Sequence, residues 1–243
     1  MRLLETLLDI VYPRECPVCG GKSDREGRFI CWRCLSSLPI RREGDGHCSI
    51  CGFTPCEDSG GAFVCQSCAS HRPAFDLARS ALDFIGPVRD FVHGFKYNGQ
   101  TWLRRDFGDI IEAAARTAFD VREIDVIVPV PLFAAKFVQR SYNQSQLLSE
   151  ELSDRIGVRH DASLLQRLRD TPTQTHLGPE ARRKNISRAF GVPCPGLVHG
   201  RTVLVVDDVM TTGATLGEIA RTLKAAGAWR VWCLTLCRAT LGK

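Results

Sequence analysis

The chain has 243 residues, a formal net charge of +5, 44% hydrophobic residues and 12 cysteines. Such a length can bury one α/β core together with a small accessory module, and it excludes neither an enzyme nor a binding protein. No apolar run approaches the roughly 20 residues needed to cross a bilayer, so we expect no membrane span.

The first expected element is an amphipathic helix over residues 1–12. Glu5 and Asp9 interrupt the segment, so it lacks the apolar centre of a signal peptide, and we expect a docking helix in a cytoplasmic protein. A membrane-surface helix is the alternative, disfavoured because Arg2 is the one basic residue there. The apolar face would carry Leu3, Leu4, Leu7, Leu8 and Val11.

Nine of the 12 cysteines lie between residues 16 and 68, and eight of these nine form four CxxC pairs. Two such pairs in series are typical of a four-cysteine zinc ribbon, since each pair aims two thiolates at one tetrahedral ion. We therefore expect two structural Zn²⁺ ions, with Cys56 as the unpaired ninth cysteine, either a spare thiol or an alternative ligand. The expected ligands are Cys16, Cys19, Cys31, Cys34, Cys48, Cys51, Cys65 and Cys68.

Alternatives to two sequential ribbons stay open at this stage. Disulfides are disfavoured because nothing indicates secretion, and four CxxC pairs are too many for one redox site. Sequential pairing is favoured over an interleaved cross-brace. His47 and His71 flank the second group and are left out of the metal set. Each zinc tetrathiolate centre adds +2 − 4 = −2, so two centres bring the formal charge from +5 to about +1, and global basicity does not argue for nucleic-acid binding.

After the zinc module, which we expect to end near Pro73, strand and helix patterns alternate and predict a mostly parallel sheet flanked by helices. We expect domains over residues 1–73 and 74–243. Strands are predicted over residues 76–84, 124–130, 202–208 and 229–239. Helices are predicted from residue 88 to a break at Asn98-Gly99, over 101–119, over 141–157, over 179–187 and from Gly213 onward, with a polar loop over 167–179.

The segment VLVVDDVMTTGATL, residues 203–216, joins a buried strand, two carboxylates and a small-residue loop that opens a helix. Ligands of open α/β sheets bind at the carboxyl ends of the strands, where Asp207 and Asp208 are expected. Backbone N–H groups at a helix start bind phosphate, and a glycine at 213 permits close approach. A ligand with vicinal hydroxyls and a phosphate is indicated. The phosphate loop would comprise Thr211, Thr212, Gly213, Ala214 and Thr215.

This motif resembles the signature of type I phosphoribosyltransferases, which bind 5-phosphoribosyl-1-pyrophosphate (PRPP). Three further segments narrow the resemblance to the ComF-like family, which has an amino-terminal zinc ribbon and is associated with competence for DNA uptake. They are FKYNGQ at residues 95–100, VPVPL…RSYNQSQLL over 128–148, and RLRDTPTQTHLGPEARRKNISRAF over 167–190. The sequence departs from the family pattern at Ser141, where a glycine is usual.

The resemblance implies a type I phosphoribosyltransferase fold behind a zinc-ribbon module, and it assigns roles to site residues. Asp207 and Asp208 would hold the ribose hydroxyls beside the reacting carbon, and the 211–215 loop the 5-phosphate. A leaving-group loop at Val130 and Pro131 would hold pyrophosphate, which Arg140 and Lys96 could reach. The 167–175 loop would be a lid carrying Arg169, Thr173 and Gln174, fixed by Arg182 and Asn185.

The implied chemistry is the displacement of pyrophosphate from ribose C1 by an unidentified acceptor, with Mg²⁺ neutralising the leaving group. A second hypothesis is a non-catalytic module of the DNA-uptake machinery that senses PRPP and contacts single-stranded DNA or a competence helicase. Its DNA surface would be Arg182, Arg183 and Lys184. A purely structural scaffold is a third. The sequence indicates neither the acceptor nor the oligomeric state.

Overall fold

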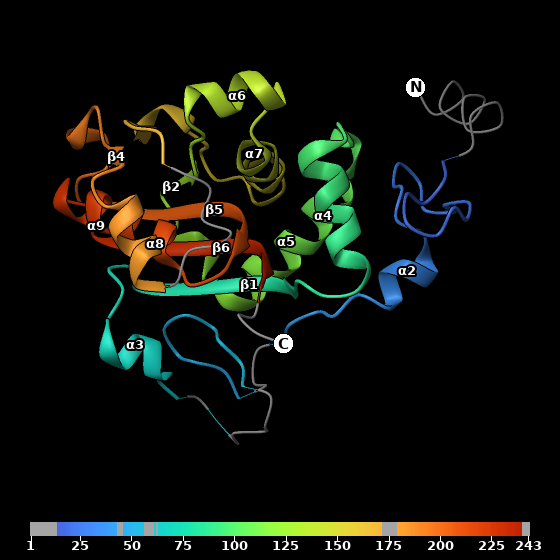
Figure 1. Cartoon of the computed structure of the whole chain (residues 1–243), viewed down its shortest axis with the longest axis horizontal. Coiled ribbons are helices and arrows are strands. Elements are labelled where there is room, and N and C mark those ends of the chain that lie inside the picture. The colour runs from blue at the N-terminus through green and yellow to red at the C-terminus, as the bar shows by residue number, and fades with distance from the viewer. Residues whose placement is uncertain (1–13, 43–45, 56–60, 62, 172–178, 240–243) are drawn as a thin grey trace.

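The computed structural model describes residues 14–42, 46–55, 61, 63–171 and 179–239. Its centre is a four-stranded, all-parallel sheet in the order β1-β6-β5-β2 (Figure 1). The expectation of a mostly parallel sheet is thus confirmed. The strands are β1 (Leu77–Asp83), β2 (Val126–Pro129), β5 (Thr202–Met210) and β6 (Arg230–Arg238). A separate antiparallel pair joins β3 (Gln166–Arg167) to β4 (Phe190–Gly191).

Helices cover both faces of the sheet, as its uninterrupted apolar strands require. Of the helices predicted, the structure forms α4 (Pro87–Tyr97), α5 (Arg104–Ala118), α7 (Gln144–Ile156), α8 (Pro179–Ile186) and α9 (Ala214–Ala225). The sequence did not predict α6 (Ala134–Arg140), which follows β2. The other helices in the described residues are α2 (Trp32–Ser36), α3 (Gln66–Ser70) and the 3-10 turns Thr101–Leu103, Val121–Glu123, Ala162–Leu164 and Pro195–Leu197.

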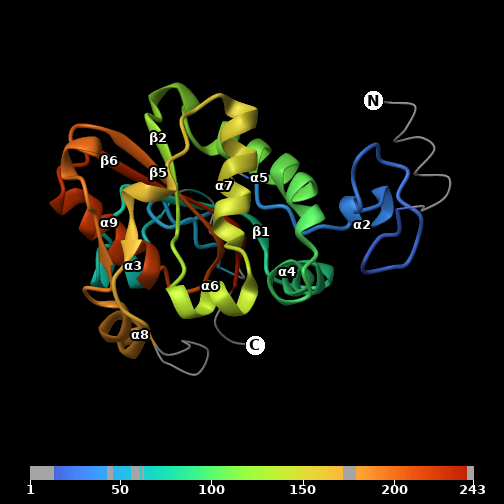
Figure 2. The same cartoon turned by 90° about the horizontal axis from the view of Figure 1, so that it is seen from above.

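The period-2 alternation of the strands divides the core in two. On one face, Leu204 and Val206 of β5 pack with α4, α5 and α7; on the other, Val203 and Val205 pack with α9. Figure 2 shows α7 and α5 on one side of the strands and α9 on the other. Both hydrophobic clusters reach β5, so the strand that carries the acidic pair is held rigidly from both sides.

The two cysteine groups lie on different sides of the domain (Figure 1). The first, with α2, belongs to the cluster of α4 and α5, and ion pairs fix it to α5: Arg25 Nη1 lies 2.7 Å from Asp106, and Arg28 Nε lies 2.6 Å from Asp109. The second, with α3, belongs to the cluster of α9. Its Ile50 carbonyl accepts a hydrogen bond from the Ala78 amide of β1 at 2.8 Å.

Residues 1–13, which include the predicted amino-terminal helix, lie outside the described residues. In the part of the chain that the structure describes, no helix combines the length and the apolar character needed to cross a membrane.

Candidate functional site

The acidic pair lies inside β5 rather than at its end. We predicted that the strand stops at Asp208, but Val209 and Met210 continue to pair with Cys237 and Arg238 of β6. On the other side, β2 ends at Pro129, opposite Val206. The carboxylates therefore stand one and two residues beyond the end of the neighbouring strand. Because β2 ends early, this part of β5 has no neighbouring strand among the described residues on that side, and residues of α4 and α7 contact it instead.

Asp207 is half-buried and accepts a hydrogen bond from Ser145 Oγ, at the start of α7, over 2.8 Å. The Asp208 amide also donates to Asp207 Oδ1, over 2.9 Å. Burial raises the pKa of Asp207 to about 7, the negative charge of Asp208 adds to this, and the Ser145 hydroxyl and the charge of Lys96 oppose it. The Asp207 carboxyl therefore gains or loses a proton near neutral pH, and the carboxylate oxygens can accept hydrogen bonds from hydroxyl groups.

Lys96, at the last turn of α4, lies with its Nζ 2.9 Å from Asp208 Oδ1. Burial acts to lower the pKa of Lys96, but the charge of Asp208 and the hydrogen bond to it outweigh burial and raise the pKa. The sequence placed Lys96 near phosphate or pyrophosphate. In the structure its partner is Asp208, so a ligand that binds this carboxylate has to compete with Lys96 for it.

The predicted phosphate loop follows directly after β5. Gly213 has φ = 76°, a left-handed conformation that glycine adopts without strain, and α9 begins at Ala214. Thr212 Oγ1 accepts a long hydrogen bond of 3.4 Å from the Ala214 amide. The first amides of α9 have no acceptor within the helix, so this end suits an anion. The five predicted loop residues, Thr211 to Thr215, thus stand together at a helix start beside the acidic pair.

The predicted leaving-group loop follows β2. The Val130 carbonyl accepts a hydrogen bond from Asn143 Nδ2 at 3.0 Å, which ties this loop, with Pro131 next in the chain, to the start of α7. Arg140 donates to Gln144 Oε1 at 3.2 Å and to the Tyr97 hydroxyl at 3.3 Å, and stacks on the Tyr97 ring. Arg140 therefore stands next to the end of α4 that carries Lys96.

Ser141, which replaces the usual family glycine, ends α6 with φ = 64°. This left-handed conformation is the one that glycine adopts most readily. The backbone turn is therefore kept without the glycine, and the cost is local strain.

The predicted lid region is described up to Thr171 and again from residue 179, so Thr173 and Gln174 fall outside the described residues. Arg169 is exposed and donates to the backbone carbonyls of Asn185, at 3.0 Å, and Ser187. Asn185 therefore does contact the lid arginine, through its backbone. Burial lowers the pKa of Arg167, which is close enough for the charge of Asp207 to act against this shift.

The sequence did not assign roles to Asn143, Gln144 and Ser145. The structure uses them as connectors: Asn143 holds the β2 loop, Ser145 holds Asp207, and Gln144 Nε2 donates to the Lys96 carbonyl at 3.2 Å. All three belong to the NQS portion of the segment RSYNQSQLL. The match of this segment to the family pattern could have pointed to these residues. Only the fold shows that they contact the loop after β2, α4 and β5.

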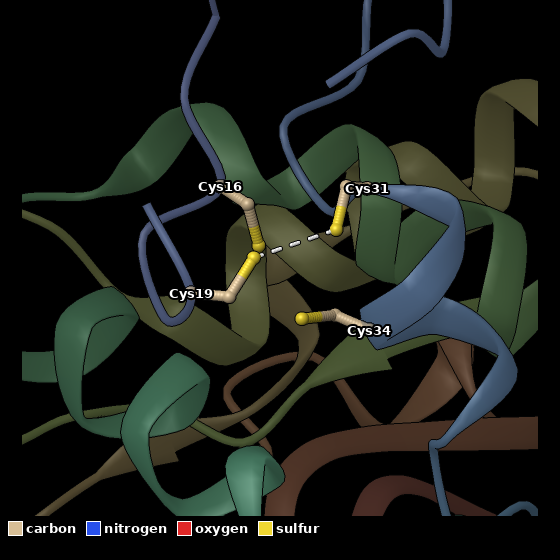
Figure 3. A group of neighbouring side chains, drawn as sticks. All are labelled: Cys16, Cys19, Cys31 and Cys34. Atoms are coloured by element: carbon tan, nitrogen blue, oxygen red, sulfur yellow. Dashed lines mark hydrogen bonds between the residues drawn. The ribbon is translucent and has the colours of Figure 1, made fainter. Parts of the chain in front are cut away.

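The eight predicted metal ligands gather into two sets of four, in the sequential pairing that we favoured. Within each set, the four sulfurs lie within 4.8 Å of one another. Figure 3 shows the first set, with all four side chains directed toward a common point. The sulfurs of Cys19 and Cys31 are 3.6 Å apart in the first set, and those of Cys51 and Cys65 are 3.7 Å apart in the second.

These separations fit zinc. Tetrahedral coordination with Zn–S bonds of about 2.3 Å places the sulfurs about 3.8 Å apart. Backbone amides support the thiolates: Gly21 donates to Cys19 Sγ at 3.4 Å and Cys65 to Cys48 Sγ at 3.3 Å. His47 and His71 are not in either set, as expected, and Cys56 lies outside the described residues. The two four-cysteine sites therefore fit structural Zn²⁺.

In a comparison with known proteins, two family models match different parts of the chain. The double zinc ribbon domain family matches residues 7–69, and the phosphoribosyl transferase domain family matches residues 105–242. Among solved structures, the glutamine PRPP amidotransferase of B. subtilis, complexed with ADP and GMP, has a TM-score of 0.37 and 22% identity over 54% of this chain and 25% of its own.

Three curated relatives match over nearly the whole chain. The DNA utilization protein YhgH of Salmonella typhimurium is 31% identical, covering 86% of this chain and 96% of its own. Competence protein F of Haemophilus influenzae is 31% identical, covering 87% and 97%. Competence protein ComFC of Streptococcus pneumoniae is 24% identical, covering 92% and 87%. Given these matches and the two four-cysteine sites beside a parallel sheet, this chain belongs to the ComF-like family, in which a double zinc ribbon accompanies a phosphoribosyltransferase domain.

Proposed function

We propose that this protein binds PRPP with Mg²⁺ and transfers its ribose 5-phosphate group to an acceptor. The observation that carries the proposal is the meeting of Asp207, Asp208, Lys96 and Ser145 directly before a left-handed Gly213 and the first turn of α9. Carboxylates suit vicinal hydroxyls, and free helical amides suit a phosphate. A sugar phosphate satisfies both groups at once.

In this proposal the acidic pair accepts hydrogen bonds from the ribose 2- and 3-hydroxyls, and the loop 211–215 binds the 5-phosphate. Because Lys96 pairs with Asp208 in the free protein, the sugar hydroxyls compete with its ammonium group for that carboxylate. A displaced Lys96 becomes available to the anionic part of the ligand. Val130, Pro131 and Arg140 are proposed to receive the pyrophosphate.

The reaction breaks the bond between ribose C1 and the pyrophosphate oxygen and forms one between C1 and the acceptor. The pyrophosphate takes the bonding electrons, while C1 becomes cation-like. Asp207 and Asp208 supply negative potential beside that carbon, and Arg169 is proposed to act from the lid, which excludes water. When bound with PRPP, Mg²⁺ would neutralise the charge that develops on the leaving group.

The test is PRPP binding by isothermal titration calorimetry with Mg²⁺, together with pyrophosphate release across a panel of nitrogenous acceptors. The Asp207→Asn/Asp208→Asn variant should bind PRPP at least about 100-fold more weakly, since each charged hydrogen bond contributes about 1.5–3 kcal/mol. Asp154→Asn, at an exposed position of the same helix as Ser145, is the matched control and should bind normally. Wild-type protein that does not bind PRPP would overturn the proposal.

We further propose that residues 74–243 form the phosphoribosyltransferase-like domain, that residues 1–73 form the zinc module, and that the protein acts in the cytoplasm in DNA uptake or utilisation. The names of the three curated relatives support that role. A competence helicase and single-stranded DNA are the proposed partners.

One observation favours a second candidate function, single-stranded DNA binding. The surface suggested by sequence includes Arg182 and Arg183, whose side chains are outside the described set. A different surface has the features that stack bases: Trp32 and Trp102 are 59% and 43% exposed, and both flank the junction of the first ribbon with α5. Arg25 stacks on Trp32, and Phe29 contacts Trp102. Aromatic platforms beside arginines are typical of single-strand binding.

Replacing Trp32 and Trp102 with Ala should weaken binding of an oligothymidine by about tenfold or more, since stacking contributes about 1–3 kcal/mol per base. Trp229→Ala removes another tryptophan, 65% exposed, and serves as the control. Fluorescence anisotropy at several salt concentrations measures both affinity and the phosphate contribution. Equal affinities for the double variant and the control would show that this surface is wrong.

A further inference from the structure

A cavity of about 560 Å³ lies between the second ribbon and α9. One wall is the predicted phosphate loop, Thr211 to Ala214, continued by Gly217 and Arg221 of α9; the facing wall is α3 with His71 and Arg72. Neither Asp207 nor Asp208 is among its described lining residues. A molecule in this cavity would touch the phosphate loop without reaching the carboxylates. The volume is in the range of small-molecule sites.

Most of the lining is apolar. Phe53, Pro73, Phe75 and Ile186 supply rings and aliphatic groups from the ribbon, the segment before β1 and α8. Phe75 also lies under the loop, since a Cβ built on Gly213 would come within 3.7 Å of its ring. A flat apolar group of ligand size can therefore be enclosed while contacting the loop from behind.

The charged groups of the cavity are mainly guanidinium groups. The described lining residues include three arginines and one carboxylate, Glu218, and Arg221 already pairs with that carboxylate over 2.5 Å. Arg238 is 7% exposed, stacks on Phe53, and donates to the Cys51 carbonyl at 2.5 Å and to Cys51 Sγ at 3.7 Å. It therefore offsets part of the negative charge that a zinc tetrathiolate brings to this wall. Arg72 is exposed at the rim of the cavity, where it could pair with an acidic group of a ligand.

We propose that this cavity is a second ligand site, which binds a flat, aromatic molecule bearing one acidic group. The aromatic part packs against Phe75, Pro73 and Ile186, and the acidic group meets Arg72. The site is separate from the proposed PRPP site but shares the loop 211–214 with it. The proposal does not depend on PRPP binding.

Gly217 offers a selective way to close the cavity. A Cβ added there would meet only Pro73 Cβ, at 4.0 Å, and Gly217 has a helical backbone within α9. Substitution is therefore sterically allowed, and it favours the helix. Gly217→Leu projects a side chain into the cavity, whereas Gly217→Ala controls for the helix effect alone. Arg72→Ala removes the rim cation, with Arg122→Ala, at an exposed position on Val121–Glu123, as its control.

The probe is anilinonaphthalene sulfonate, whose fluorescence rises in an apolar site, titrated into zinc-loaded full-length protein without PRPP. We expect saturable binding to wild type and Gly217→Ala, at least tenfold weaker binding to Gly217→Leu, and roughly fivefold weaker binding to Arg72→Ala but not Arg122→Ala. Ribose 5-phosphate at saturating concentration should leave the probe in place. Zinc content and near-ultraviolet circular dichroism establish that each variant is folded.

Wild-type affinity in Gly217→Leu would overturn the proposal, and so would full displacement of the probe by ribose 5-phosphate, which would make the cavity part of the sugar-phosphate site. Should Gly217→Leu fail to fold, the Arg72→Ala and Arg122→Ala pair decides: equal affinities overturn the proposal. Protein that binds the probe as expected but does not bind PRPP would overturn the proposed transferase function and leave the second site standing.

Discussion

The two zinc ribbons use the same chemistry but attach to the phosphoribosyltransferase domain in different ways. The first is fixed by buried ion pairs between Arg25 or Arg28 and the carboxylates of α5, and its cysteines join the hydrophobic cluster of α4 and α5. The second is fixed by the edge of β1 and by Arg238, and it shares a cavity with the predicted phosphate loop. Loss of zinc from one ribbon should therefore affect different parts of the domain than loss from the other, because the two ribbons contact different elements.

The largest difference should follow loss of one metal. Cys65→Ser, in the second ribbon, should release about one zinc and weaken PRPP binding at least tenfold, because a loosened ribbon no longer supports the phosphate loop. Cys34→Ser, the equivalent change in the first ribbon, should also release about one zinc but change PRPP affinity less than twofold. Atomic absorption and calorimetry measure the two quantities. Equal losses of affinity would remove the functional distinction between the ribbons.

The next largest effect concerns the attachment of the first ribbon. Asp106 has a fully buried side chain that pairs with Arg25 and accepts hydrogen bonds from the Phe29 and Ile30 amides. Asp106→Asn leaves Arg25 without its charged partner and should lower the free energy of unfolding by about 3 kcal/mol, with PRPP affinity preserved.

Urea denaturation measures this loss, with Asp120→Asn as the control. Asp120 forms an exposed pair with Arg122, and its replacement should have almost no effect. A control variant as unstable as Asp106→Asn would show that burial of the first-ribbon ion pair contributes nothing.

A smaller effect is a pH dependence of stability that arises at the acidic pair and not at either ribbon. Burial and the charge of Asp208 raise the pKa of Asp207 to about 7, well above that of an aspartate in the unfolded chain. The folded state therefore binds the extra proton between about pH 4 and pH 7, and this group destabilises the fold progressively as the pH rises across that window. Above pH 7 both states are ionised and the contribution is constant.

Carboxyl ¹³C chemical shifts should show Asp207 titrating near pH 7 in the wild type and at lower pH in Asp208→Asn, where the like charge is gone. Asp106→Asn should leave this midpoint unchanged, since Asp106 pairs with the first ribbon and not with the acidic pair. A shift of the midpoint in Asp106→Asn would contradict the separation of the two regions.

The smallest expected effect is a change in stability from a substitution outside both ribbons. Ser141→Gly relieves the left-handed conformation at the end of α6 and should raise the free energy of unfolding by about 0.5–1 kcal/mol, after the greater freedom of glycine in the unfolded chain is subtracted. Thermal unfolding measures it. Gly157→Ala, at a left-handed helix end of α7, should have the opposite sign and serves as the reciprocal control.

The sequence by itself determined the parallel sheet, the strands and most helices, because buried strands and amphipathic helices leave periodic patterns that survive without tertiary information. It also identified the eight cysteine ligands, since CxxC spacing fixes local ligand geometry, but it only favoured their sequential pairing, which the structure then confirmed. It predicted the small-residue loop and the acidic pair as neighbours. It missed α6, whose short segment after β2 has little periodicity, and it ended β5 too early, because pairing of Val209 and Met210 with β6 is a long-range contact.

Only the tertiary structure decided how these parts meet. Ser145 reaches Asp207 from α7, 62 residues away along the chain, and Lys96 reaches Asp208 from α4, which lies earlier still. Arg238 connects a ribbon cysteine to the end of the last strand, a separation of 187 residues. Such contacts depend on packing between elements distant in sequence, which no local pattern encodes. For the same reason, two ribbons that share the CxxC pattern have different neighbours, one beside α5 and the other beside the predicted phosphate loop.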